Sequence, residues 1–191
     1  MMKFIILQDN MDLNTQLFYF INNGLSNPYF DFLMPHLTDI GGISFYACLF
    51  IVLLLITRKD IFGLKKYYPL VKLCICSLLL CVLITAGLKL FFSSPRPSIV
   101  LEHVNVLTSS YDPNSFPSGH TATTLSVMTV LFLKAKKYFN RANLIQCLAV
   151  AYAIMIAFSR IYIGMHFPFD VLIGGVIGMV SGVVAVKCLK V

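Results

Sequence analysis

Long apolar stretches constrain the fold of this chain more than any other feature. Residues 67–88 carry a single charged side chain, Lys72 near the start, and residues 40–57 carry none. A helix needs about 20 apolar residues to cross the hydrocarbon core of a bilayer. Backbone polar groups in that core must bond within the protein, so such stretches fold as helices. The chain is also 58% hydrophobic and 12% charged, so we expect an integral membrane protein.

Five stretches are expected to cross the membrane, which predicts an all-α integral membrane helical bundle. They are residues 40–57, 67–88, 118–133, 142–159 and 171–186. All are near the short end of the usual range, so their ends are expected to extend into the neighbouring polar residues. We expect a single domain over residues 1–191, with residues 40–191 as the transmembrane bundle.

The N-terminal region is expected to lie on the membrane. Residues 11–40 are amphipathic, and their apolar runs are too short to cross a bilayer. We expect two helices in the interface. Their buried sides would be formed by Leu17, Phe18, Phe20, Ile21, Phe30, Phe32, Leu33 and Met34. A single broken crossing, giving six crossings in all, is the alternative. Residues 1–7 lack the features of a signal peptide, so the first membrane segment is expected to direct insertion.

Glycine and cysteine positions suggest how the spans pack. Gly174, Gly178 and Gly182 repeat every four residues and give one smooth helix face. We expect this face to pack inside the bundle, with a dimer contact as the alternative, so both a monomer and a homodimer remain open. All six cysteines fall in the spans or near the C-terminus, which favours free packing residues over disulfides.

The cations indicate the orientation of the bundle. Five alternating spans place eleven of the fifteen Lys and Arg residues on one side. These are Arg58, Lys59, Lys65, Lys66, Lys72, Lys134, Lys136, Lys137, Arg141, Lys187 and Lys190. That side is expected to be cytoplasmic. The net charge of +7 is then mostly an orientation signal and a contact with anionic lipids, and we expect no nucleic-acid partner.

Three cations fall on the opposite side and predict an anionic ligand. Arg96 and Arg160 offer planar forks suited to two phosphate oxygens, and Lys89 acts as a compact charge. Pro95 and Pro97 bracket Arg96 and stiffen the chain that presents it. The ligand is expected on the extracytoplasmic face.

A small-residue turn leads into the third span. Ser118, Gly119 and His120 follow Pro117 where a loop is expected to become a helix. The free N–H groups of a helix start favour an anion, and Gly119 lets an oxygen approach closely. Ser118 as an N-cap is compatible with this interpretation.

His166 and Asp170 are four residues apart, the spacing that places two side chains on one helix face. A carboxylate bonded to one ring nitrogen sets the tautomer and leaves the other nitrogen free to attack. His36 and His103 lie outside such a motif and are expected to be structural.

These clusters form three ordered motifs, K-x6-R-P from Lys89, P-S-G-H from Pro117 and S-R-x5-H-x3-D from Ser159. The pattern resembles the type 2 phosphatidic acid phosphatase (PAP2) superfamily, in its bacterial membrane lipid phosphatase branch. The resemblance implies that His166 attacks phosphorus to form a phosphohistidine, that Asp170 orients it, and that His120 protonates the leaving oxygen. It also implies phosphate-binding residues, Lys89, Arg96, Arg160, Ser118 and Gly119, with supporting roles for Pro97, Pro117 and Ser159.

The implied function is a metal-independent lipid phosphatase at the outer leaflet that needs no cofactor, since a two-metal site requires several clustered carboxylates. The expected partners are membrane lipids and a lipid phosphate substrate. Candidate substrates are phosphatidic acid, phosphatidylglycerophosphate, undecaprenyl diphosphate and lipid A phosphates. The alternatives are a membrane phosphotransferase, a lipid-phosphate binding or transport protein, and the vanadium haloperoxidase branch, which the apolar spans disfavour.

Overall fold

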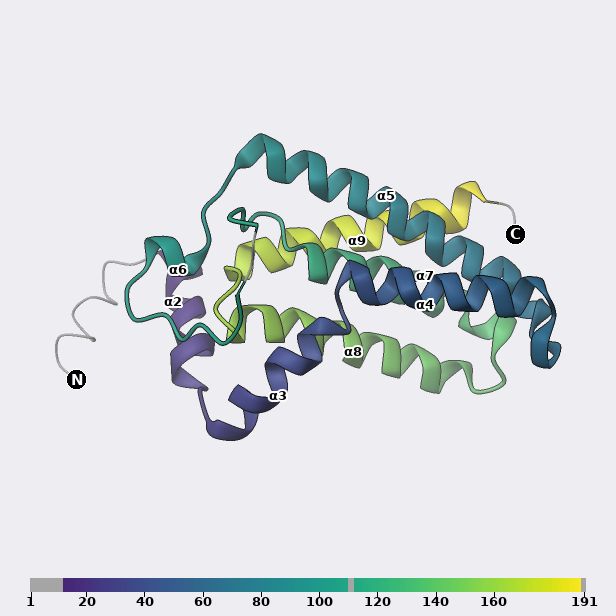
Figure 1. Cartoon of the computed structure of the whole chain (residues 1–191), viewed down its shortest axis with the longest axis horizontal. Coiled ribbons are helices and arrows are strands. Elements are labelled where there is room, and N and C mark those ends of the chain that lie inside the picture. The colour runs from purple at the N-terminus through teal and green to yellow at the C-terminus, as the bar shows by residue number, and fades with distance from the viewer. Residues whose placement is uncertain (1–11, 110–111, 190–191) are drawn as a thin grey trace.

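The computed structural model describes residues 12–109 and 112–189, in which all regular secondary structure is helical (Figure 1). The expectation about residues 1–7 falls outside this range. In chain order the α-helices are α2 (Leu13–Tyr19), α3 (Pro28–Asp39), α4 (Ile43–Arg58), α5 (Tyr68–Phe92), α6 (Pro97–Val100), α7 (Gly119–Tyr138), α8 (Ala142–Tyr162) and α9 (Pro168–Cys188). A π-helical turn, Phe20–Gly24, follows α2, and two short 3-10 turns, Ile61–Gly63 and Lys65–Tyr67, join α4 to α5.

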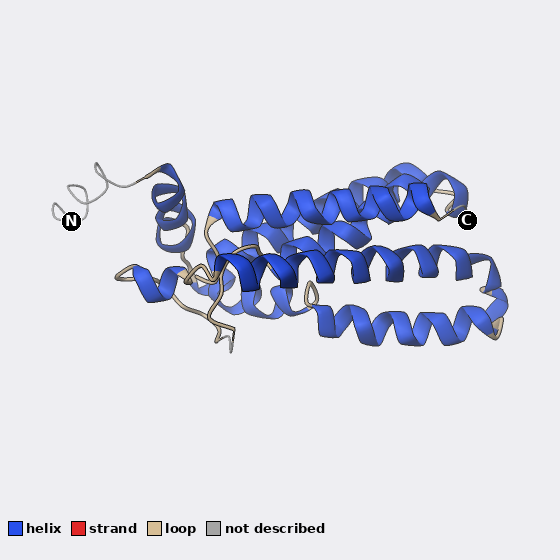
Figure 2. Cartoon of the chain, turned by 90° about the horizontal axis from the view of Figure 1, so that it is seen from above, coloured by secondary structure: helices blue, strands red, loops and turns tan. Residues whose placement is uncertain are grey.

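The five long helices α4, α5, α7, α8 and α9 run side by side along the long axis of the molecule (Figures 1 and 2). Helices α2, α3 and α6 gather at one end. The α4–α5 and α7–α8 connections and the end of α9 lie at the other end. The predicted cytoplasmic cations lie in these connections or in the adjoining turns of the helices, apart from Lys190, which lies outside the described residues. Their placement at one end of the bundle is therefore confirmed.

Three of the five predicted spans are helices long and apolar enough to cross a membrane, namely Lys65–Phe92, Ala142–Tyr162 and Pro168–Cys188. The span predicted at residues 40–57 is the helix Ile43–Arg58. It meets the same criteria only together with Pro28–Asp39, from which it is bent by 50°. The span predicted at residues 118–133 is α7, which has 20 residues but is not among the candidate spans.

Helix α7 is more polar than a span that faces lipid. It can be so because it lies inside the bundle, in contact with α5, α8 and α9. Its buried hydroxyl groups bond to protein backbone: Thr123 Oγ1 donates to the Gly41 carbonyl at 2.8 Å, and Ser126 Oγ donates to the Thr123 carbonyl at 2.8 Å. Buried polar groups that are paired in this way carry little penalty. The polar character of α7 therefore follows from its central position.

The N-terminal region forms two helices, as predicted. Helix α3 begins where Asn27 Oδ1 accepts a hydrogen bond from the Phe30 N–H at 3.0 Å, and Pro28 occupies the first turn. Of the apolar side chains expected on the buried sides, Phe18 and Met34 are buried within the protein. Five others are exposed on its surface: Leu17, Phe20, Phe30, Phe32 and Leu33. The location of α2 and α3 in the membrane interface stays a prediction.

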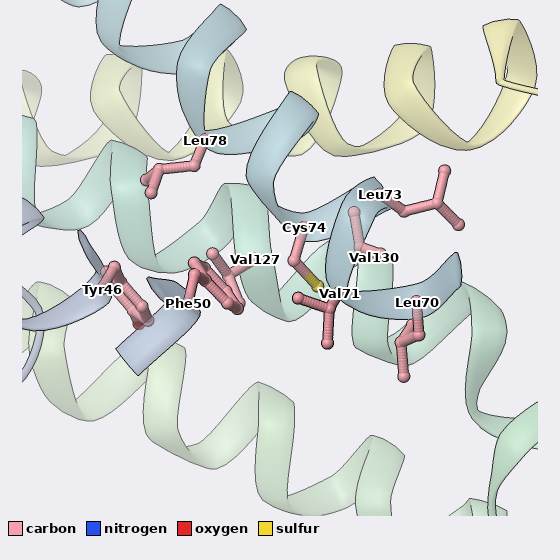
Figure 3. Close-up of a cluster of buried hydrophobic side chains, with 9 residues drawn as sticks. All are labelled: Tyr46, Phe50, Leu70, Val71, Leu73, Cys74, Leu78, Val127 and Val130. Atoms are coloured by element: carbon pink, nitrogen blue, oxygen red, sulfur yellow. The ribbon is translucent and has the colours of Figure 1, made fainter. Parts of the chain in front are cut away.

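A cluster of apolar side chains joins α4, α5 and α7 (Figure 3). Its buried members are Tyr46, Phe50, Leu70, Val71, Leu73, Cys74, Leu78, Val127 and Val130. Its members from α5 all lie in the first half of that helix, whereas Lys89 lies in the last turn. The cluster therefore holds the three helices together at a distance from Lys89. All six cysteines are free, and Cys74 and Cys81 are buried packing residues.

The glycine face of α9 packs against α7, so the predicted packing within the bundle is confirmed. A Cβ atom at Gly174 would lie 2.5 Å from the Ser118 carbonyl oxygen, and one at Gly182 would lie 2.6 Å from Thr129 Cβ. At Gly178 the added atom would collide with the Ala122 carbonyl oxygen. Backbone atoms cannot move aside as a side chain can, so α7 and α9 approach this closely only because α9 has glycine here.

We expect Gly178→Ala to destabilise the protein by about 1–3 kcal/mol, because the added methyl group forces α7 and α9 apart. Gly87→Ala is the matched control. Gly87 lies in α5 with nothing within 4 Å of its added Cβ, so this change should be neutral or stabilise by up to about 1 kcal/mol. Thermal unfolding of the purified proteins in one detergent measures both. Equal stability of the two variants would contradict the packing described here.

Candidate active site

The three motif clusters meet around one cavity of about 280 Å³ at the end of the bundle near α2, α3 and α6. Six of the predicted site residues line it: Lys89, Arg96, Gly119, His120, Arg160 and His166. They come from the last turns of α5 and α8, the first turn of α7, and the loops that precede α6 and α9. His36 and His103 do not line it. Residues up to 77 positions apart in sequence thus face one small space.

A loop between α6 and α7 holds two of the cations. Lys89 Nζ donates to Asp112 Oδ2 at 2.6 Å and to the Asn114 carbonyl at 2.7 Å. Arg96 Nε donates to the Asp112 carbonyl at 2.7 Å. Burial acts to raise the pKa of Asp112, but the hydrogen bonds from Lys89 and from the Asn114 N–H outweigh it and lower that pKa below its ordinary value. Asp112 is therefore an ionised partner that orients both cations.

Arg160 is held from the N-terminal region. Its Nη1 donates to Thr38 Oγ1 on α3 at 2.9 Å, and the residue is only 5% exposed. Its Nε atom is buried and has no hydrogen-bond partner among the described residues. Leaving a charged donor unpaired in a buried position costs more than the average hydrogen bond contributes. An anion in the cavity would supply the acceptor that this guanidinium lacks.

The start of α7 forms one wall of the cavity. Gly119 and His120 line it, whereas Ser118 is fully buried and does not. Ser118 is the N-cap residue of α7, as predicted, but its hydroxyl lies 3.0 Å from Thr121 Oγ1 and makes no cap hydrogen bond to the backbone. The Ser118 N–H donates to the Asp170 carbonyl at 3.0 Å. Ser118 thus ties the start of α7 to the start of α9, behind the cavity.

The predicted supporting residues also lie behind the cavity lining. Pro97 is the first residue of α6, directly after Arg96, and Pro117 precedes the turn into α7. The Ser159 hydroxyl donates to the Ile156 carbonyl of its own helix at 2.7 Å. Each sits next to a residue of the candidate site and shapes the backbone that carries it.

His166 is buried in the loop before α9, and its two ring nitrogens have different surroundings. Nε2 lies 3.5 Å from Arg96 Nη1, while Nδ1 lies 3.3 Å from Ser115 Oγ. Nδ1 and Asp170 Oδ2 are 3.7 Å apart, which is beyond hydrogen-bond range. The direct hydrogen bond predicted between His166 and Asp170 is therefore wrong in this structure. Ser115 lies between them, and its Oγ donates to Asp170 Oδ2 at 2.5 Å.

Burial lowers the pKa of His166 well below its ordinary value, and the nearby positive charges of Arg160, Arg96 and Lys89 act in the same direction. The imidazole is therefore neutral at neutral pH. A neutral ring keeps a nitrogen lone pair, which is the form required of a nucleophile.

Sequence reasoning missed three residues of this site, namely Thr38, Asp112 and Ser115. Thr38 lies on a helix assigned only to the membrane interface, 122 positions before Arg160. Asp112 and Ser115 lie in a loop that carries no helical or strand pattern. The closeness of Ser115 to Pro117 along the chain was the one signal available. In the described residues no group of three or more His, Cys, Asp and Glu side chains is placed to hold a metal ion.

Fold and site together define a multi-pass membrane phosphatase: apolar helices carry two histidines and three cations around one cavity at their ends. Comparison with known proteins supports this class. The model of the PAP2 superfamily matches residues 69–191, so the chain belongs to that superfamily.

Three known proteins are similar to this chain over most of their length. The crystal structure of Aquifex aeolicus LpxE matches 93% of this chain and 97% of its own, with 35% sequence identity and a TM-score of 0.74. A Bacillus licheniformis protein named bacitracin transport permease protein BcrC is 28% identical, over 89% of this chain and 77% of its own. The undecaprenyl-diphosphatase of Sulfolobus acidocaldarius is 24% identical, over 92% and 78%. The chain is a membrane lipid phosphatase of the PAP2 type.

Proposed function

We propose that this protein, as one domain over residues 1–191, hydrolyses a phosphate monoester or diphosphate of a membrane lipid at the outer leaflet, through a phosphohistidine on His166. The observation that carries the proposal is the cavity itself. Its lining includes the three cations Lys89, Arg96 and Arg160 together with both histidines, His120 and His166. Arg160 Nε, which has no partner within residues 12–109 and 112–189, offers a donor to an anionic oxygen.

The proposed reaction has two steps. His166 Nε2 attacks phosphorus, the new N–P bond forms, and the bond to the leaving oxygen breaks. His120 gives its proton to that oxygen, and the negative charge of the bound phosphate favours the protonated form of His120 beforehand. Water then attacks the phosphohistidine, passes a proton to His120, and releases inorganic phosphate. The three cations and the N–H groups at the start of α7 stabilise the charge on the phosphoryl oxygens.

The cavity walls suit a substrate whose chains stay in lipid. Beside the cations, the lining includes the apolar residues Ile43 on α4 and Val82 and Ala86 on α5. Ile43 is 48% exposed on the protein surface. A lipid could therefore place its phosphate among the cations while its hydrocarbon stays against the outside of these helices.

The proposed substrate class is a lipid phosphate such as phosphatidic acid, phosphatidylglycerophosphate, undecaprenyl diphosphate or a lipid A phosphate. The similarity to an undecaprenyl-diphosphatase supports a diphosphate within that class. The similarity to a protein named a transport permease keeps the binding or transport alternative open to test. A phosphotransferase with the same residues would pass the phosphoryl group to an acceptor other than water.

We expect the purified protein to release inorganic phosphate from at least one of these four lipids in mixed micelles. EDTA should leave the rate nearly unchanged, because three protein cations supply the charge that a metal ion would otherwise bring. Vanadate should inhibit by imitating five-coordinate phosphorus, and His166→Ala is the inactive control. Binding without release would favour a binding protein. Release only with an added acceptor would favour a transferase, and a loss with EDTA that Mg²⁺ restores would indicate another mechanism.

The proposed outer-leaflet location rests on the cations at the opposite end of the bundle, which are expected to face the cytoplasm. In a background without the native cysteines, Ser109→Cys should react with an impermeant thiol reagent in intact cells. Ser109 is exposed in the loop at the site end. Lys136→Cys, exposed near the end of α7, should react only after lysis. The reverse pattern would place the cavity in the cytoplasm.

The two histidines should respond differently to the leaving group. His120→Ala removes the acid, a loss of about 10²- to 10⁴-fold with an alkyl phosphate, and p-nitrophenolate leaves without much protonation. We therefore expect His120→Ala to recover a larger share of wild-type activity with p-nitrophenyl phosphate than with a lipid phosphate. His166→Ala should stay inactive on both because it lacks the nucleophile. Steady-state rates on the two substrates measure this difference. If p-nitrophenyl phosphate restored activity to His166→Ala and not to His120→Ala, the roles of nucleophile and acid would have to be exchanged.

A further inference from the structure

Ser115 occupies the space between the candidate nucleophile and its carboxylate. The residue is 0% exposed. Its backbone N–H donates to the Ser94 carbonyl at 2.7 Å, which fixes it beside the segment that carries Arg96. Its hydroxyl oxygen lies 2.5 Å from Asp170 Oδ2 and 3.3 Å from His166 Nδ1. The same Asp170 oxygen accepts from the Phe167 N–H at 2.9 Å, so the carboxylate is itself held in place.

The proton inventory sets the direction of these contacts. A serine hydroxyl has one proton to donate and lone pairs that accept. The Asp170 carboxylate oxygen is the closer acceptor, at 2.5 Å against 3.3 Å for His166 Nδ1, so it takes the hydroxyl proton. The Ser115 oxygen then faces His166 Nδ1 with a lone pair and accepts from it. Nδ1 therefore carries the ring proton, and Nε2, toward the cavity, keeps its lone pair.

We propose that Ser115 is a positioning residue: its hydroxyl group links Asp170 to His166, so that Asp170 orients the imidazole ring through Ser115. The inference rests on the proposed role of His166 as nucleophile. Attack on phosphorus makes the imidazole cationic, which strengthens the bond from Nδ1–H to the Ser115 oxygen. The carboxylate behind the hydroxyl increases this effect because it polarises the O–H bond.

A second group near the ring could do the same work. The backbone carbonyl of Ser115 also interacts with His166, in the direction that raises its pKa. Any substitution at position 115 leaves this carbonyl in place. Variants that differ only in the side-chain hydroxyl therefore separate the two possibilities.

The test compares Ser115→Thr with Ser115→Val, since Thr and Val have nearly the same shape and differ in the hydroxyl. The added methyl group affects both equally. With the lipid phosphate that wild type hydrolyses, we expect Ser115→Val to have a kcat about 10- to 100-fold below that of Ser115→Thr, the size of loss seen when a hydrogen-bond partner that orients a metal-ligating histidine is removed. KM should be similar in the two variants. Ser181→Ala, which removes a buried hydroxyl of α9 that donates to the Ile177 carbonyl and does not line the cavity, should match wild type.

A double-mutant cycle tests whether Asp170 acts through Ser115. In the Ser115→Thr background, Asp170→Asn should lower kcat by its full amount. In the Ser115→Val background it should add less than about threefold, because the connection is already broken. Equal kcat values for the Thr and Val variants, or losses that multiply independently, would overturn the inference.

A spectroscopic measurement keeps the inference separate from the proposed function. Nitrogen NMR of protein labelled with ¹⁵N-histidine, assigned with His166→Ala, reports the ring tautomer without turnover. We expect Nδ1–H in wild type and in Ser115→Thr, and a mixture of tautomers in Ser115→Val. An Nε2–H ring in wild type would refute the role of Ser115 even if the enzyme is active. The Nδ1–H form in a wild-type protein that releases phosphate from no lipid would refute the proposed function alone.

Discussion

The close packing of α7 against α9 is the contact on which the site depends. Three glycines of α9 let the backbones of α7 and α9 come into contact. At the site end the same approach lets the Ser118 N–H bond to the Asp170 carbonyl. This bond places the turn before His120 beside Asp170, four residues after His166. A wider spacing of the two helices would separate the two histidines that the proposed chemistry needs together.

The positive charges of the three cavity cations, Lys89, Arg96 and Arg160, are only partly offset by neighbouring side chains. Three cations in a small, partly buried space repel one another, and burial adds a further cost. Asp112 offsets part of this at Lys89 and Arg96, and the charge of Asp170 acts on both in the same direction. Arg160 Nη1 donates to the neutral hydroxyl of Thr38, and Arg160 Nε has no hydrogen-bond partner among the described residues. The remaining positive charge gives the cavity its preference for a phosphate anion.

Most cavity residues and three of the spans could be predicted from the sequence, because the spacing of the motifs and the length of the apolar stretches can be read directly from it. The cavity residues Lys89, Arg96, His120, Arg160 and His166 were all identified, as were three of the spans. Thr38 and Ser115 were not, because their roles depend on contacts between distant segments that no local pattern records. Helix α7 was predicted as an ordinary span, yet only the fold explains why it tolerates so many hydroxyl groups.

The break between α3 and α4 shows how an interrupted helix can belong to a membrane protein's site. Free backbone groups in a membrane must find partners within the protein. Here the Ile40 carbonyl accepts from Tyr152 Oη at 2.8 Å, and the Gly41 carbonyl accepts from Thr123 Oγ1 at 2.8 Å. A Cβ at Gly42 would come within 3.1 Å of His120 Nε2. The backbone carbonyl groups at the break are thus hydrogen-bonded by side chains of α7 and α8, and the glycine there leaves room for His120. Residues that precede the region matched by the family model, 69–191, are therefore part of the cavity's construction.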